Sequence, residues 1–152
     1  MLKAILAAAI WLHCASAAAA GTEPLSITDP WVRATVPGQK VAAAYMSLTA
    51  SSRVALVAAK SPAARKAEIH SMTMEAGVMK MRQVARLDVV PGKPLVLAPG
   101  GYHLMLVDVV RELKAGEKVS LAVTVEDEKG VRRDVNVEAP VREAAAQPQH
   151  KH

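Results

Sequence analysis

Histidine and methionine side chains gather in one stretch of the chain, from His70 to Met105. The chain has seven methionines and five histidines, and this window holds five of the methionines and two of the histidines. Imidazole nitrogen and thioether sulfur both bind soft, late transition metals, and Cu(I) suits this mixture best. Zinc prefers thiolate, imidazole and carboxylate, whereas calcium and magnesium prefer oxygen. The window predicts a copper site drawn from His70, Met72, Met74, Met79, Met81, His103 and Met105.

The spacing of these residues places several of them on common strand faces, because residues two apart in a β-strand point the same way. Segments 67–74 and 78–84 flank a turn at Gly77, which predicts a β-hairpin. The hairpin brings Met72 near Met81, unless a bulge shifts the register by one residue. If the strand carrying His103 passes beside this hairpin, histidines and thioethers converge on one patch.

Methionine also fills gaps in apolar cores, and this chain has no phenylalanine to supply that volume. Met46 lies inside an apolar run and is assigned to the core. For the other methionines, core packing stays open as an alternative to metal binding. The paired pattern of two histidines, each followed two residues later by methionine, favours the metal site.

Short apolar or alternating segments recur along the chain, separated by proline and glycine, with no long amphipathic helix. This pattern predicts an antiparallel β-sandwich. Segment 41–49 is rich in alanine, so a helix competes with a strand there. The expected strands are 26–36, 41–49, 54–58, 67–74, 78–84, 87–90, 95–97, 102–110, 119–126 and 131–137.

The first twenty residues resemble a cleaved signal peptide, with a positive start, an apolar run and small residues at the end. Cys14 raises the alternative of lipidation, but bulky His13 stands where a small residue is needed. We expect cleavage of residues 1–20 and no stable membrane insertion afterwards. A copper-binding domain is expected over 21–138 and a flexible, histidine-containing tail over 139–152.

Removal of the signal peptide would take away the only cysteine. The exported domain would then have no thiolate for a metal, for a blue-copper centre or for nucleophilic catalysis. No carboxylate at a suggestive spacing orients the two histidines of the window, so an enzyme is not expected. The net charge of +5 is spread along the chain. It predicts a solvated surface or steering towards an acidic partner, and export argues against nucleic acid.

His70, ten residues, Met81, twenty-one residues and then His103-x-Met105 reproduce a spaced motif. The segments around the motif, including Pro99-Gly-Gly-Tyr-His-Leu-Met105, fit the same pattern. The chain resembles the periplasmic copper chaperone family PCuAC over roughly residues 28–126.

The resemblance implies a cupredoxin-like or immunoglobulin-like β-sandwich that binds Cu(I) through His70, Met81, His103 and Met105. It implies a carrier in the periplasm of a Gram-negative-type bacterium. That carrier delivers copper for assembly of the CuA centre of cytochrome c oxidase. The expected partners are oxidase subunit II or a Sco-type thiol protein.

Residues outside the four-residue motif give further expectations. Met72, Met74 and Met79 are candidate auxiliary ligands or a hand-over path, with packing around the site as the default interpretation. His150 and His152 are a candidate second site, for Cu(II), or belong to a tail without function. Proton competition for the two motif histidines predicts weaker copper binding in acid.

Two other functions stay open from the sequence. One is copper sequestration for tolerance, without a specific recipient. The other is a metal-free β-sandwich that acts as an interaction module through an exposed methionine patch.

Overall fold

The computed structural model describes residues 25–143. The expected signal peptide, Cys14, His150 and His152 lie outside the described residues. Between residues 25 and 143 the chain forms strands and no helix, so this part contains no helical segment able to cross a bilayer. The strands are β1 Leu25–Arg33, β2 Val41–Ala50, β3 Val54–Lys60, β4 Ala64–Glu75, β5 Val78–Gln83, β6 Leu87–Val89, β7 Leu95–Leu97, β8 His103–Val109, β9 Lys118–Asp127 and β10 Arg132–Arg142.

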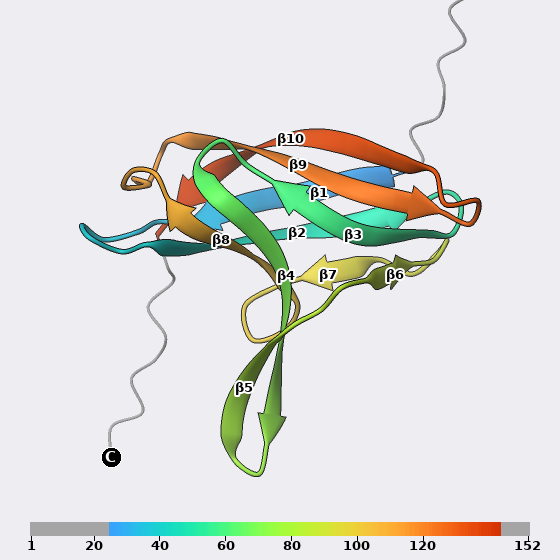
Figure 1. Ribbon diagram of the computed structural model, residues 1–152, viewed down its shortest axis with the longest axis horizontal. Helices are drawn as coiled ribbons and strands as arrows, with labels where there is room; N and C mark the ends of the chain where they lie inside the picture. The colour runs from blue at the N-terminus through green and yellow to red at the C-terminus, as the bar shows by residue number, and fades with distance from the viewer. Residues whose placement is uncertain (1–24, 144–152) are drawn as a thin grey trace, which may run out of the picture.

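The strands form one continuous sheet in the order β5-β4-β8-β2-β1-β10-β9-β3-β6, with β7 paired to β2. An additional β3–β4 pairing closes the sheet on itself, so its inner faces pack against each other (Figure 1). Every pairing is antiparallel except that of β1 with β10. The predicted β-sandwich is confirmed, with one parallel pair that the sequence did not indicate.

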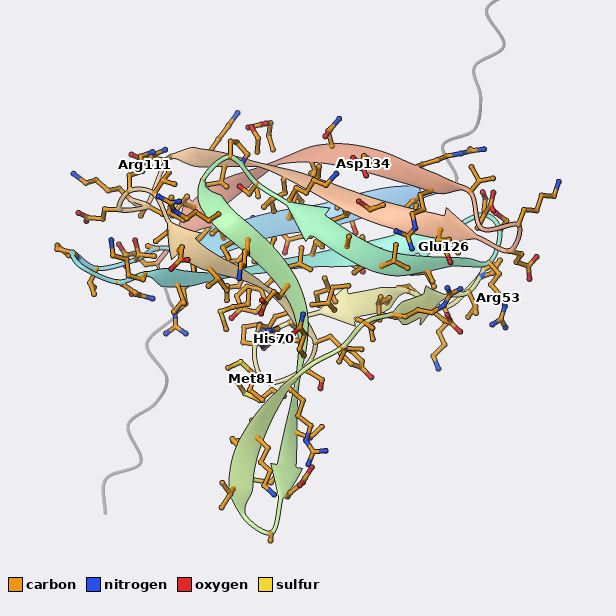
Figure 2. All side chains as sticks on the ribbon, viewed as in Figure 1. Arg53, His70, Met81, Arg111, Glu126 and Asp134 are labelled. Atoms are coloured by element: carbon orange, nitrogen blue, oxygen red, sulfur yellow. The ribbon has the colours of Figure 1, made fainter. Side chains whose placement is uncertain are left out.

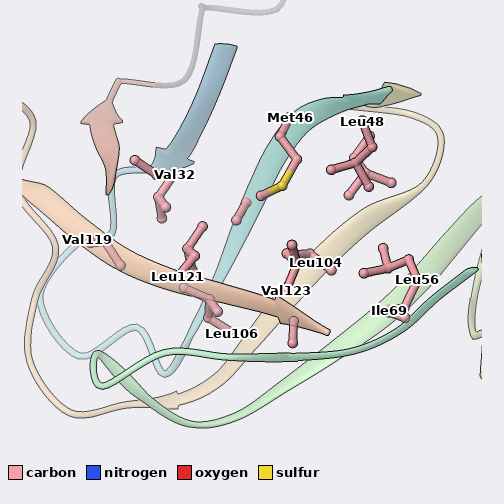
Figure 3. Close-up of a cluster of buried hydrophobic side chains, with 14 of the residues drawn as sticks. Val32, Met46, Leu48, Leu56, Ile69, Leu104, Leu106, Val119, Leu121 and Val123 are labelled. Atoms are coloured by element: carbon pink, nitrogen blue, oxygen red, sulfur yellow. The ribbon is translucent and has the colours of Figure 1, made fainter. Parts of the chain in front are cut away.

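The core fills the space between the inner faces. Alternate residues of β2, β8 and β9 point inward, which is the pattern expected of strands with one buried face. Met46 is only 2% exposed and points into this cluster, so its assignment to the core is confirmed (Figure 3). The cluster in Figure 3 includes Val32, Leu48, Leu56, Ile69, Leu104, Leu106, Val119, Leu121 and Val123.

The structure decides between helix and strand in one segment and corrects the expected start of the C-terminal tail in another. Segment 41–50 is strand β2 rather than a helix, because its alternation lets it pair with β1 on one side and with β7 and β8 on the other. The tail expected from Ala139 is wrong for its first residues, since β10 continues to Arg142. Ala139 and Val141 are buried, and the Val141 amide donates to the Glu117 carbonyl at 2.7 Å.

The predicted hairpin is formed by the second half of β4 and by β5. It projects from the body as a separate arm (Figure 1). Ala76 and Gly77 connect the strands with φ values of 49° and 79°, which is the two-residue turn with positive φ at both central positions. Met72 lies directly opposite Met81, so the expected register is confirmed without a bulge.

Candidate metal centre

The two histidines of the window meet on the outer face of the sheet, where the hairpin leaves the body. Strand β4 pairs with β8 so that His70 lies directly opposite His103. Their ring centroids are 5.8 Å apart and the rings are tilted by 49°. Two imidazoles that are distant in the sequence are therefore held side by side by backbone pairing.

Hydrogen bonding determines which ring nitrogen of His103 is free to bind a metal ion. The Nδ1–H of His103 donates to the Gly101 carbonyl at 3.1 Å, because a carbonyl can only accept. In the neutral ring this leaves Nε2 with a free lone pair. The His103 residue is only 3% exposed, so the ring is held by its surroundings rather than by solvent.

The other histidine presents its opposite nitrogen. The Nε2–H of His70 donates to the carboxylate of Glu68 at 2.9 Å. Its Nδ1 is buried and has no hydrogen-bond partner among the described residues. A buried polar atom without a partner is costly, so a lone pair in this position calls for a ligand. Metal-binding histidines commonly donate their second N–H to a carboxylate in this way.

Glu68 corrects the sequence interpretation, which found no carboxylate to orient either histidine. Glu68 and His70 are two residues apart on β4 and share a face, which lets the carboxylate reach the ring. The same alternation rule that grouped the methionines would have identified Glu68.

The motif methionines lie on the same outer face, on either side of His70. Met105 is opposite Glu68 on β8, one position along from the histidine pair on that face. Met81 is opposite Met72 on β5 and is 45% exposed. Figure 2 shows His70 and Met81 at the base of the hairpin. The pairing joins the two histidines directly, whereas the two methionines reach them through their long, flexible side chains.

The remaining methionines of the window extend outward along the hairpin. Met74 lies opposite Met79, and their exposed fractions are 63% and 46%. Neither belongs to the hydrophobic core. The default expectation that these methionines pack around the site is therefore wrong for Met74 and Met79, because the hairpin stands clear of the body.

An aromatic row that the sequence analysis did not identify continues from His103 across the outer face. The Tyr45 ring lies 6.4 Å from His103, and the Trp31 ring lies 4.5 Å from Tyr45. The Arg142 guanidinium is 5.9 Å from the Trp31 ring centroid, within range of a cation–π contact. Burial raises the pKa of the Tyr45 hydroxyl, although the charge and hydrogen bond of Arg33 oppose this shift.

Oxygen, nitrogen and thiolate ligands do not by themselves form a metal site in this part of the chain. Across residues 25–143, no group of three or more His, Cys, Asp or Glu side chains is arranged to hold a metal ion. A metal bound at the histidine pair would therefore draw on the neighbouring thioethers. That ligand set is the one that favours Cu(I).

The fold and the outer-face histidines define a cupredoxin-like β-sandwich of the PCuAC type. It is similar to the copper-bound PCuAC domain from PmoF2, with a TM-score of 0.64 and 25% identity over 80% of this chain and 95% of that domain. It is also similar to the solution structure of apo-DR1885 from Deinococcus radiodurans, with a TM-score of 0.61 and 30% identity over 95% of each chain.

The Cu(I) form of DR1885 matches with a TM-score of 0.57 and 32% identity, over 85% of this chain and 83% of that one. A family model described as "Putative lipoprotein LpqE-like" matches residues 25–141. The chain belongs to this LpqE-like family, whose description indicates an exported protein. The resemblance to PCuAC is confirmed at the level of the fold, whereas the family model has a different name.

A curated relative agrees with the family assignment. The relative described as "Putative lipoprotein Lxx21020" of Leifsonia xyli subsp. xyli (strain CTCB07) is 31% identical over 104 residues, which is 68% of this chain. The match spans 63% of the length of that relative.

Proposed function

We propose that this protein is a copper metallochaperone that binds Cu(I) through His70, Met81, His103 and Met105. One observation carries the proposal. His70 and His103 face each other with one nitrogen each tied to a protein acceptor, and the Nδ1 of His70 is buried without a partner. The similarity to copper-bound PCuAC domains supports this copper chaperone-like function.

The site suits transfer of the ion rather than chemistry on it. All four proposed ligands are neutral, so no thiolate has to be protonated when Cu(I) leaves. Glu68 orients the His70 ring and keeps its Nδ1 turned away from the carboxylate. Met81 is about half exposed, which leaves the ion open to ligand exchange with an incoming protein. This exposure favours a carrier over a storage protein.

The proposed recipient is the CuA centre of cytochrome c oxidase, reached through subunit II or a Sco-type thiol protein. The proposed location is the periplasm, after cleavage of residues 1–20. N-terminal sequencing of the exported protein would find a start near Gly21. A lipidated Cys14 at the N-terminus would contradict the cleavage proposal.

The first test is an anaerobic Cu(I) titration against a chromophoric competitor. Met81→Leu/Met105→Leu removes two proposed ligands with little change in volume, and we expect at least tenfold weaker binding of the first equivalent. Met46→Leu makes the same chemical change in the buried core, away from every proposed ligand, and serves as the control. Equal first-equivalent affinity in both variants would contradict the four-residue site.

The aromatic row supplies an independent readout of the same titration. Trp31 is coupled through Tyr45 to His103, so binding at the histidine pair is expected to change tryptophan emission. Transfer is tested by mixing the Cu(I)-loaded protein with the copper-free soluble domain of oxidase subunit II, oxidising the product with ferricyanide, and recording the absorption of the mixed-valence CuA centre. Tight binding without any transfer to this domain or to a Sco-type protein would favour sequestration.

A further inference from the structure

The hairpin beyond His70 has two chemically different faces. One face carries Glu75, whose carboxylate accepts from Lys80 and from Arg82, each at 2.9 Å. The opposite face presents only thioethers over its outer two residue pairs. These pairs are Met72 with Met81 and Met74 with Met79.

Packing does not explain the thioether face. All six residues of β5 are exposed, and Met46 is the only methionine in the described core cluster. Polar side chains would be expected on an arm that projects into solvent, because exposed apolar side chains gain nothing from burial there. The presence of methionine at positions 74 and 79 therefore needs an explanation other than packing.

The cross-strand geometry suits a single soft ion. Residues directly opposite each other in an antiparallel pair have Cβ atoms about 4.5–5.5 Å apart. Two sulfurs that bind one ion linearly lie about 4.6 Å apart, twice a metal–sulfur bond of ~2.3 Å. The three rotatable bonds of methionine allow Met74 and Met79 to meet this spacing, and Met72 on the same face can supply a third sulfur.

The ligand chemistry selects the ion. This outer part of the face offers no carboxylate, imidazole or thiolate, so zinc, calcium and magnesium lack their preferred ligands. Neutral thioethers favour a soft monovalent ion such as Cu(I). We propose a second, distal Cu(I) site formed by Met74 and Met79, with Met72 as a third ligand. It uses none of the four ligands of the proposed chaperone site.

The distal site is tested by residue-resolved NMR of the full protein labelled with ¹³C at the methionine methyl groups. Ag(I) is the probe, because it binds thioethers as Cu(I) does and is stable in air, and an anaerobic Cu(I) titration follows. We expect the Met74 and Met79 methyl signals to shift within two equivalents. Met46 is buried in the core and serves as the internal reference.

Two variants distinguish the distal site from the proposed four-residue site. Met74→Leu/Met79→Leu is expected to lose one bound equivalent and to keep the shifts of Met81 and Met105. Thr73→Leu/Lys80→Leu places the same leucines on the charged face and is expected to bind as the unmodified protein does.

Two results would overturn the distal site. One is a pair of Met74 and Met79 signals that do not move through two equivalents. The other is a Met74→Leu/Met79→Leu variant that binds as many ions as the unmodified protein. Shifts at Met74 and Met79 with none at Met81 and Met105 would instead overturn the four-residue site and leave the distal site standing.

Discussion

The body of this protein and its hairpin differ in how far their side chains are buried. In the body, strands such as β8 and β9 alternate buried and exposed residues, and Leu104, Leu106 and Val123 have no exposed surface. In the hairpin, every residue of β5 is exposed and the chain contributes nothing to the core. The same period-two alternation thus produces burial in one region and chemically distinct solvent-facing surfaces in the other.

The body and the hairpin place their methionines in different environments. Met46 sits in the body, where its volume is needed and leucine would serve nearly as well. The hairpin methionines lie where side-chain volume fills no core, and the proposed copper sites use their sulfur atoms. Substitutions in the body should therefore change the free energy of unfolding. Substitutions in the hairpin and at its junction with β8 should change metal binding.

The largest expected effect is the loss of free energy of unfolding when a core residue of the body is replaced. Leu121→Ala removes a side chain that is 1% exposed, and we expect a loss of about 2–5 kcal/mol. Met79→Ala on the hairpin is expected to change it by no more than about 0.5 kcal/mol. Urea denaturation measures both. A loss at Met79 as large as that at Leu121 would erase the distinction between the regions.

The next effect is on copper affinity at the junction. Glu68→Ala removes the carboxylate that orients His70, and a 10–100-fold weaker Cu(I) affinity is expected for such a partner. Glu68→Gln keeps a hydrogen-bond acceptor and should restore part of this loss. Glu75→Ala, on the charged face of the hairpin, is the matched control. An unchanged affinity in Glu68→Ala would mean that the carboxylate does not position the ring.

The smallest effect concerns the hairpin turn. Ala76 has a φ of 49°, a conformation that asparagine and glycine adopt more readily than alanine. Ala76→Asn is expected to stabilise the hairpin by less than about 1 kcal/mol. Amide hydrogen exchange should slow in β5 and stay unchanged in β9. Equal slowing in both strands would show that body and hairpin open as one unit.

Much of this molecule could be predicted from local sequence patterns. The hairpin and the Met72–Met81 register follow from a two-residue turn between alternating segments. The burial of Met46 follows from its place in an apolar run. The contact of Glu68 with His70 could also have been predicted, since the alternation rule places both residues on one face. The end of β10 could not be predicted, because the buried Ala139 and Val141 occur in a short segment that contains proline.

The properties that follow from the residues alone are local. Residue type and spacing within a strand decide which side chains share a face, because alternation is a property of the extended backbone. They also indicated a soft-metal ligand set and a β-sandwich.

The order of the strands in the sheet, by contrast, depends on the whole fold. The β4–β8 pairing sets His70 against His103, the parallel β1–β10 pairing completes the sheet, and the row from His103 to Trp31 crosses three strands. The physical reason is that pairing between distant strands depends on burial of the whole core, which no local pattern specifies.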